Sequence, residues 1–427
     1  MADIAATGSQ QARTAPREAL RTPDGRPLKQ ALAQAERRAR TRAFLLVLPL
    51  LAFVLLTFII PIGQMLSRSV LNDTFSANMP ALTQWFAENP GAEPDEAAFE
   101  ALVIDLRASK EARTQGAVGT RINYEVPGTR SLFTSTARRA DRLEPPYREA
   151  VLEVDDDWAR RDLWAAMRSA AAPVTLNFYQ AALDRKINAE GTFERADEQS
   201  RIYLTLFTRT FVLSIVITGL CLLLGFPVAH LLAVLPMRKA SLLLILVLLP
   251  FWTSLLVRTT SWMVLLQGQG VINNTLVALG ILSDDGRISM MYNQAGTIIA
   301  MTHILLPFMI LPLYSVMKTI PPSYARAARS LGATSWTTFR RIYVPQTVPG
   351  VGAGAILVFI LAVGYYITPA LVGGATGTLI SNQIAFHMQS SLNWSLAAAL
   401  AAMLLASVLV LYWVYDRIVG IDNMKLG

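Results

Sequence analysis

The sequence predicts an all-α, polytopic membrane protein with six transmembrane helices. Its 427 residues are 53% hydrophobic and only 16% charged, whereas soluble domains average about 25% charged residues. Six apolar runs are long enough to cross a bilayer as helices. Basic residues gather at the ends of these runs, so membrane orientation explains the net charge of +8 better than nucleic-acid binding does. The runs are Ala43–Ile62, Phe207–Leu235, Ala240–Leu265, Gly296–Val316, Val348–Thr368 and Ser395–Ile418.

The first 42 residues are predicted to be a cytoplasmic tail. They hold nine Lys or Arg against four acids, include Pro16, Pro23 and Pro27, and show little apolar periodicity. The run Ala43–Ile62 has 20 residues, and a helix of that length spans about 30 Å. We assign residues 43–66 to the first transmembrane helix. A cleaved signal peptide is not favoured, because the polar leader and the apolar run are both too long.

Residues 67–201 are predicted to be a mainly helical, extracytoplasmic insert. Ser67–Arg201 contains 17 basic and 22 acidic residues, unlike the apolar runs on either side. Asp95–Arg113 and Pro146–Ala171 have helical apolar spacing, and prolines such as Pro90 and Pro127 mark breaks. We expect this insert either to contact a solute-binding protein or to brace the protein.

Residues 202–419 are predicted to form the membrane core, with five helices, and residues 420–427 a cytoplasmic end. Arg238 and Lys239 follow the second run, and Lys318–Arg341 carries five basic residues and no acid. Asp284 and Asp285 fall on the opposite side of the predicted topology. Because Lys and Arg are enriched in cytoplasmic loops, both termini are expected in the cytoplasm.

The loop 318–345 contains closely spaced small residues. Ala327 and Ala328 let the backbone of a partner approach closely, and Gly332 can join two short helices. The order is Ala327-Ala328, three residues, Gly332, nine residues, Ile342-Tyr343-Val344-Pro345. This spacing resembles the cytoplasmic loop of permease subunits of binding-protein-dependent ABC importers. The residues that we expect to couple the chain to an ATPase are Tyr324, Arg326, Ala327, Ala328, Leu331, Gly332, Ile342 and Pro345.

The resemblance implies a type I ABC importer permease fold in the bacterial inner membrane. It also implies a dimer of cytoplasmic ATPases, a similar but distinct second permease and an extracytoplasmic solute-binding protein as partners. The loop departs from the family at Arg326, where the family has glutamate. Either the loop docks through shape and apolar residues such as Leu331 and Trp336, or the ATPase offers an acidic patch to Arg326.

Three further stretches point to the solute. Gly225–Ala229, Pro250–Arg258 and Gly364–Gly374 resemble spermidine/putrescine and opine-type permeases, and the resemblance covers roughly residues 175–427. It implies a polyamine or a related amine as cargo. Aromatic rings can attract an ammonium group by about 0.5–2 kcal/mol, although Trp and Tyr also anchor span ends. The residues of the possible translocation path are Trp252, Arg258, Trp262, Tyr365 and Tyr366. Arg258 would repel a cation, so an anionic or zwitterionic solute stays open.

The sequence lacks the motifs of an enzyme. It has no Walker A loop, no Ser-His-Asp grouping and no cluster with metal-ligand spacing, so we expect no catalytic residues, metal site or cofactor. Gly350 and Gly354 form a GxxxG pattern that favours helix packing. The alternative function is an ion-coupled secondary transporter, which would need intramembrane ionisable residues that the runs do not show. A membrane anchor for the insert leaves the 318–345 loop unexplained.

Overall fold

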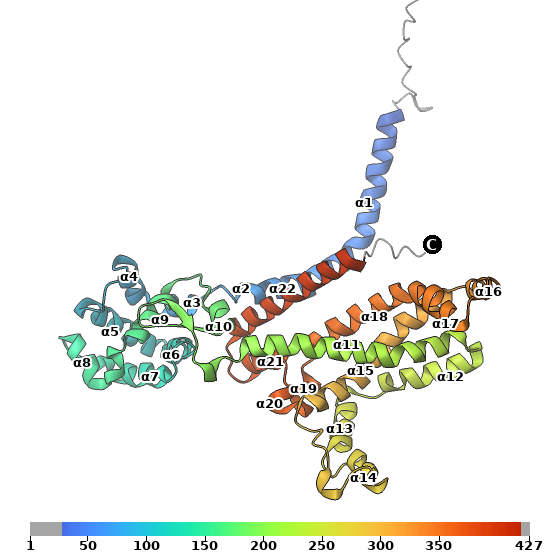
Figure 1. Cartoon of the computed structure of the whole chain (residues 1–427). Coiled ribbons are helices and arrows are strands. Elements are labelled where there is room, and N and C mark those ends of the chain that lie inside the picture. The colour runs from blue at the N-terminus through green and yellow to red at the C-terminus, as the bar shows by residue number, and fades with distance from the viewer. Residues whose placement is uncertain (1–27, 420–427) are drawn as a thin grey trace, which may run out of the picture. The chain divides into compact units, whose positions relative to one another are not determined.

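The structure is a computed structural model that describes residues 28–419. Most of the predicted N-terminal tail, residues 1–27, and the predicted C-terminal segment, residues 420–427, lie outside the described residues. The described chain is almost entirely helical, with one two-stranded antiparallel sheet (Figure 1). It divides into two units, residues 1–65 and residues 66–427.

The first unit is a long, mostly apolar helix. It comprises α1 (Leu28–Val54), a π-helical segment η1 (Leu55–Ile59) and the beginning of α2 (Ile60–Ser67). Together these elements provide the candidate span Glu36–Ser67. The helix begins before the predicted start at residue 43, because the residues ahead of the apolar run are good helix formers such as Glu36 and Arg40.

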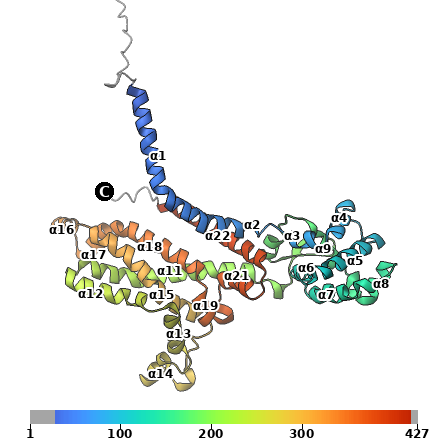
Figure 2. The same cartoon turned by 180° about the vertical axis from the view of Figure 1, so that it is seen from behind.

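The insert, residues 67–201, is a bundle of short helices with its own core (Figures 1 and 2). Its elements are α3 (Asp73–Asn78), α4 (Pro80–Glu88), α5 (Glu96–Glu111), α6 (Gln115–Asn123), α7 (Thr129–Arg139), η2 (Ala140–Arg142), α8 (Tyr147–Val154), η3 (Asp156–Ala159), α9 (Arg161–Ala171), α10 (Asn177–Ala182), β1 (Arg185–Ile187), β2 (Phe193–Arg195) and η4 (Glu198–Ser200). Fully buried Phe75, Phe133 and Trp158 lie in one apolar cluster. The Trp158 indole Nε1 donates a hydrogen bond to Thr136 Oγ1 at 2.9 Å, so these two buried polar groups satisfy each other.

The two helical stretches predicted in the insert differ in outcome. Asp95 caps α5, and its side chain accepts a hydrogen bond from Ala98 N at 3.0 Å, which explains why the helix begins there. The predicted stretch Pro146–Ala171 is not one helix, because η3 separates α8 from α9. The Asp155 side chain accepts a hydrogen bond from the Asp157 backbone N–H at 3.1 Å, a local turn that competes with the helical pattern.

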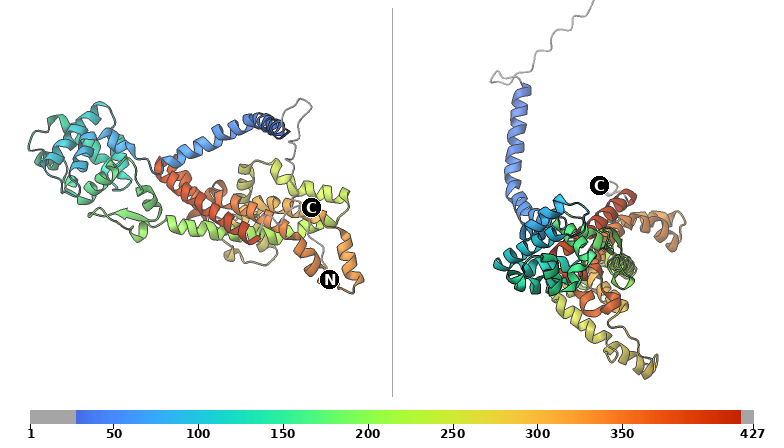
Figure 3. Two further views of the ribbon diagram at one scale, coloured as in Figure 1. Left: turned by 90° about the horizontal axis from the view of Figure 1, so that it is seen from above. Right: turned by 90° about the vertical axis from the view of Figure 1, so that its left-hand side faces the viewer.

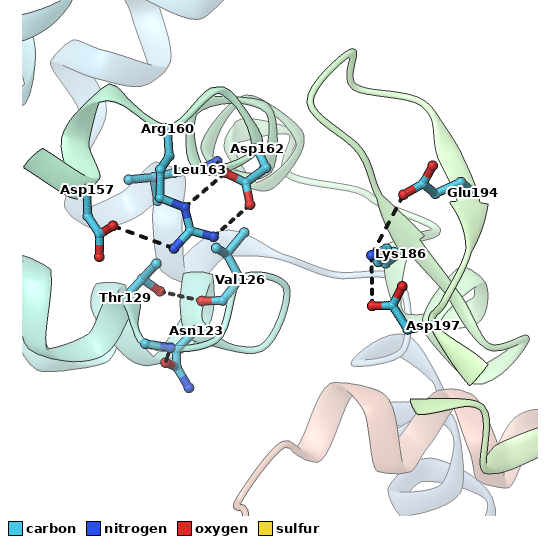
Figure 4. Close-up of polar contacts among 11 residues, drawn as sticks. Asn123, Val126, Thr129, Asp157, Arg160, Asp162, Leu163, Lys186, Glu194 and Asp197 are labelled. Carbon is cyan, nitrogen blue, oxygen red and sulfur yellow. Dashed lines mark hydrogen bonds and ion pairs between the residues drawn. The ribbon is translucent and has the colours of Figure 1, made fainter. Parts of the chain in front are cut away.

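Exposed ion pairs lie at two turns of the insert (Figure 4). Arg160 lies between two acids, with its Nη2 2.7 Å from Asp162 Oδ2. The guanidinium holds the pKa of the Asp162 carboxyl below its usual range. Beyond it, Lys186 Nζ on β1 lies 3.0 Å from Asp197 Oδ2, just after β2. These exposed pairs fix local turns and contribute little stability individually.

The base of the insert is closed on itself and then seated on the core. An isolated antiparallel bridge joins Leu71 to Val174, so the helical segment between these two residues begins and ends at one point. Next to it, α10 packs against the first turns of α11 (Tyr203–Val234) and α22 (Trp394–Val419). This joint buries Phe178 and Ala182 of α10 against Leu400 of α22. The insert is therefore seated on the ends of two apolar helices.

The membrane core consists of long helices and short connecting elements. Besides α11 and α22, these are α12 (Met237–Leu248), η5 (Leu249–Trp252), α13 (Leu255–Leu266), α14 (Val271–Ala278), η6 (Asp284–Gly286), α15 (Gln294–Thr319), α16 (Pro322–Ser330), α17 (Ser335–Thr338), η7 (Phe339–Tyr343), α18 (Val344–Gly364), α19 (Ile367–Val372), α20 (Gly374–Gly377) and α21 (Ile380–Gln389). α15 packs against both α11 and α18, and the insert and the α16–α17 connection lie at opposite ends of α11 (Figures 1 and 3).

Glycines allow the close approach of α11, α15 and α18. A Cβ at Gly354 would lie 2.7 Å from Met309 Sδ, and one at Gly350 would lie 3.0 Å from Val316 Cβ. On α11, a Cβ at Gly225 would meet the same Met309 at 3.2 Å. The predicted packing role of the Gly350 and Gly354 pattern is therefore confirmed.

The number of candidate spans agrees with the predicted architecture, but the third span is broken. Five described helices are long and apolar enough to cross a membrane, and the pair Met237–Trp252 and Leu255–Ala278 adds a sixth if it counts as one span. That pair bends by 96°, so the predicted apolar span Ala240–Leu265 is present as a broken span. Pro250 lacks the N–H that a continuous helix needs, and Ser254 then caps α13 by accepting a hydrogen bond from Val257 N at 3.2 Å.

Candidate functional site

The 318–345 loop forms two short helices joined by a glycine. α16 starts with Pro322 in its first turn and ends with hydrogen bonds from Gly332 N to Arg329 O, at 3.0 Å, and from Ala333 N to Ala328 O, at 3.1 Å. This pair of bonds is a Schellman motif, which requires a left-handed residue after the helix. Gly332 supplies it with φ +86°. The predicted position of Gly332 between two helices is the one observed.

The loop exposes large apolar side chains. Leu331 is 89% exposed and Trp336 is 69% exposed, and Tyr324 is also exposed. Ala327 is exposed while Ala328 is half-buried, so the two alanines do not face the same way. Exposed apolar side chains grouped on one loop indicate a contact surface for a partner. Within residues 36–417, Arg326 is exposed and has no ion pair.

An aromatic stack connects the loop to α11. The rings of Trp336 and Phe339 stack with centroids 5.9 Å apart, and Phe339 and Tyr343 stack at the same separation. His230 of α11 packs against Tyr343 with ring centroids 4.9 Å apart. The predicted residue Ile342 lies beside this stack and helps line a cavity of about 550 Å³ under α16, whereas Pro345 is exposed at the start of α18. The stack links the exposed loop to the helices of the core.

The predicted path residues come together only in part. The Trp262 indole Nε1 donates a hydrogen bond to His303 Nδ1 at 3.1 Å, and the two rings contact edge to face. Arg258, one turn earlier on α13, is close enough to interact electrostatically with both His303 and Tyr365. The broken span therefore places a cation, an imidazole and two aromatic rings beside α15 and the end of α18.

Two other predicted path residues lie outside this group of contacts. Trp252, at the break of the third span, is 76% exposed, and its indole makes no hydrogen bond or ring contact within the described part of the chain. The backbone oxygen of Tyr366 accepts a hydrogen bond from Asn382 Nδ2 at 2.7 Å, and its side chain is exposed. Their exposure fits the interfacial role as well as a path role.

Comparison with known proteins identifies the family. Residues 200–420 match the family model described as "Binding-protein-dependent transport system inner membrane component". The chain belongs to this family. It is therefore a multi-pass inner-membrane permease subunit of a binding-protein-dependent ABC importer, a class that works with ATPase subunits and a solute-binding protein. The alternative of an ion-coupled transporter has no support.

The relatives of this permease include polyamine permeases. The spermidine/putrescine transport system permease protein PotB of Escherichia coli (strain K12) is 36% identical over 222 residues, which is 51% of this chain and 80% of that protein. PotB of Haemophilus influenzae (strain ATCC 51907 / DSM 11121 / KW20 / Rd) is 36% identical over 225 residues, covering 53% and 78%. The inner membrane ABC transporter permease protein YdcU of E. coli K12 is 33% identical over 201 residues, covering 45% and 64%.

The contacts of His230 and His303 were not predicted from the sequence. His303 interrupts an apolar span, where a polar side chain usually faces protein or water, and this position is a usable signal. His230 follows Pro227 at the end of a span and carries no local signature. Its role depends on the aromatic rings of the 318–345 loop, which approach it only in the folded chain.

Proposed function

We propose that this permease imports a polyamine or a related amine, and that its 318–345 loop is the contact with the ATPase. The proposal is carried by the capped connection at Gly332, which holds α16 and α17 at an angle while exposing Leu331 and Trp336. The identity to spermidine/putrescine permeases supports the choice of cargo. In this proposal both termini are cytoplasmic, the insert is extracytoplasmic, and the second permease is a distinct chain.

The transmission of movement follows from the contacts of the loop. An ATPase that pulls on α16 displaces Trp336 and Phe339, and the aromatic stack carries this displacement to His230 on α11. α11 in turn packs on α15, which packs on α18. A displacement at the loop therefore reaches the helices that we expect to line the solute pathway.

The charge of Arg326 favours one of the two docking models. Because this guanidinium is exposed and unpaired among residues 36–417, docking without an acidic partner would gain nothing from its charge. We propose an acidic patch on the ATPase that faces Arg326. The test is a charge exchange: Arg326→Glu should reduce uptake, and reversing the charge of the facing ATPase residue should restore it. Unchanged uptake in Arg326→Glu would show docking by shape alone.

A cationic cargo needs carboxylates that the membrane core of this chain lacks near the predicted path. The only acids between residues 202 and 415 are Asp284 and Asp285, which lie in η6 and not on the elements that carry Trp262 and Tyr365. We propose that the solute-binding protein and the second permease supply the charge complement, and that Trp262 and Tyr365 contribute cation–π attraction.

The decisive experiment is ATP-dependent uptake in proteoliposomes that contain both permeases and the ATPase, with the solute-binding protein added. Labelled putrescine and spermidine are the test solutes, and sulfate is the anionic control. Saturable amine uptake that requires ATP supports the proposal, and uptake of the anion alone refutes the cargo. Contact between the loop and the ATPase is measured separately, by crosslinking from Ala327→Cys. The native Cys221 does not interfere, because it is fully buried and unreactive. The control is Ala278→Cys on α14, which should not crosslink to the ATPase.

A further inference from the structure

A basic pocket lies where the insert meets the last span. It has a volume of about 470 Å³ and is lined by Arg68, Arg121 and Arg130, together with Tyr124 and Trp394. Arg121 and Tyr124 come from α6 and its end, while Trp394 opens α22. The Tyr124 hydroxyl donates a hydrogen bond to Ser391 O at 3.3 Å, which closes the pocket between insert and core.

The pocket carries more positive than negative charge. Arg121 Nη2 is paired with Glu125 at 2.8 Å, whereas no carboxylate within residues 36–417 pairs with Arg68 or Arg130. Three arginines and one glutamate leave a surplus of two positive charges. The insert as a whole has 17 basic and 22 acidic residues, so the surplus of positive charge at this pocket is a local feature.

Arg121 makes the pocket a built site rather than a group of surface arginines. Its side chain is only 5% exposed, its Nε donates a hydrogen bond to Asn72 Oδ1 at 2.6 Å, and its guanidinium lies over the Phe178 ring. These contacts fix its orientation. Its Nη1 is buried and has no hydrogen-bond partner among the described residues, so its N–H donors are left unsatisfied at the wall of the pocket.

The position of the pocket identifies the ligand. Arg68 directly follows the candidate span Glu36–Ser67, and Trp394 is the first residue of the candidate span Trp394–Arg417. Span ends lie at the level of lipid headgroups, where Trp and Tyr are enriched. Arginine recognises phosphate oxygens in a bidentate fashion. Because two candidate spans end at the pocket, the phosphate of a lipid headgroup is the phosphate that its position favours.

We propose that this pocket binds the phosphate group of an anionic membrane lipid and thereby fastens the insert to the last span. Arg68 and Arg130 contact the phosphate, Arg121 provides its remaining donor, and Trp394 lies against the glycerol region. A lipid headgroup and free inorganic phosphate both carry the phosphate group that the arginines would bind. The test must therefore distinguish binding of the lipid from binding of the free anion. This site does not depend on which solute the permease carries.

The test uses the complete transporter purified in a neutral detergent and native mass spectrometry. The probes are dioctanoyl phosphatidylglycerol, dioctanoyl phosphatidylcholine, glycerol 3-phosphate and inorganic phosphate. Phosphatidylglycerol should bind at least about tenfold more tightly than the other three. Arg68→Gln/Arg130→Gln should weaken its binding by about tenfold or more for each arginine removed.

Two further variants make the outcome specific. Arg139→Gln/Arg148→Gln removes the same charge from exposed insert residues outside the pocket, and it should bind phosphatidylglycerol like the wild type. Gly116→Leu fills the pocket without changing charge, because a Cβ there meets no atom within 4 Å, and it should weaken binding as well. Equal loss in the two arginine pairs would overturn the site. Equal binding of inorganic phosphate and phosphatidylglycerol would overturn the lipid as its ligand.

Discussion

The connection at Gly332 allows a quantitative test of the loop. At φ +86° a residue with a Cβ carries a conformational cost of about 1–2 kcal/mol. A Cβ at Gly332 would have no atom within 4 Å, so clashes add nothing to that cost. Gly332→Ala should therefore reduce the population of the capped loop by about fivefold to thirtyfold relative to alternative loop conformations.

The assay for Gly332→Ala is the affinity of the ATPase for the permease in proteoliposomes, measured together with ATP-dependent uptake. Affinity should fall by about the same factor if docking needs the capped loop. Gly332→Asn should lose less, because asparagine tolerates the left-handed region better than alanine. Gly219→Ala, an exposed helical glycine with open space around it, is the matched control and should leave affinity unchanged. If Gly332→Ala and Gly219→Ala behave alike, the capped geometry is not required for docking.

Three other predictions follow from the contacts. Gly354→Leu should destabilise the core by about 1–3 kcal/mol, because a Cβ would lie 3.2 Å from the Met309 carbonyl oxygen, and it should lower the unfolding temperature in detergent while Gly219→Leu does not. Burial raises the pKa of Asp105 above its usual value, so the free energy of unfolding of the insert should fall as pH rises through that pKa. Limited proteolysis should show this trend in the wild type and not in Asp105→Asn. Arg258→Gln should speed amine uptake by up to about 18-fold, since a unit charge about 10 Å away at an effective dielectric constant of about 20 contributes roughly 1.7 kcal/mol. An unchanged rate would place Arg258 away from the solute.

The features that depend on local rules were predictable from the sequence. Apolar runs of span length give the candidate spans, and Gly332 marks the join of α16 and α17. Gly350 and Gly354 indicate close helix packing because the pattern needs only helical periodicity. The spacing of residues in the 318–345 loop matches that of the family, and this match needs no information on the tertiary structure.

The features that depend on long-range contacts were not predictable. Pro250 marks a possible kink within the third apolar run, but the size of the bend, 96°, becomes evident only when α13 leaves the direction of α12. Membrane helices often tolerate proline, so proline alone does not indicate a break. Likewise Arg121 carries no sequence signal, because its burial depends on Asn72 and Phe178, which are about 50 residues away on either side in the chain.

The bridge between Leu71 and Val174 has a consequence for how the chain could have acquired its insert. Backbone hydrogen bonds from Asn72 N to Pro173 O, at 2.9 Å, and from Thr175 N to Val70 O, at 2.8 Å, bring the two crossing points together. A segment whose ends meet in this way can be excised or exchanged with a brief linker, because the flanking chain keeps its course. The segment between Leu71 and Val174 can therefore vary or be replaced as one unit, without changes to the packing of α11, α15 and α18.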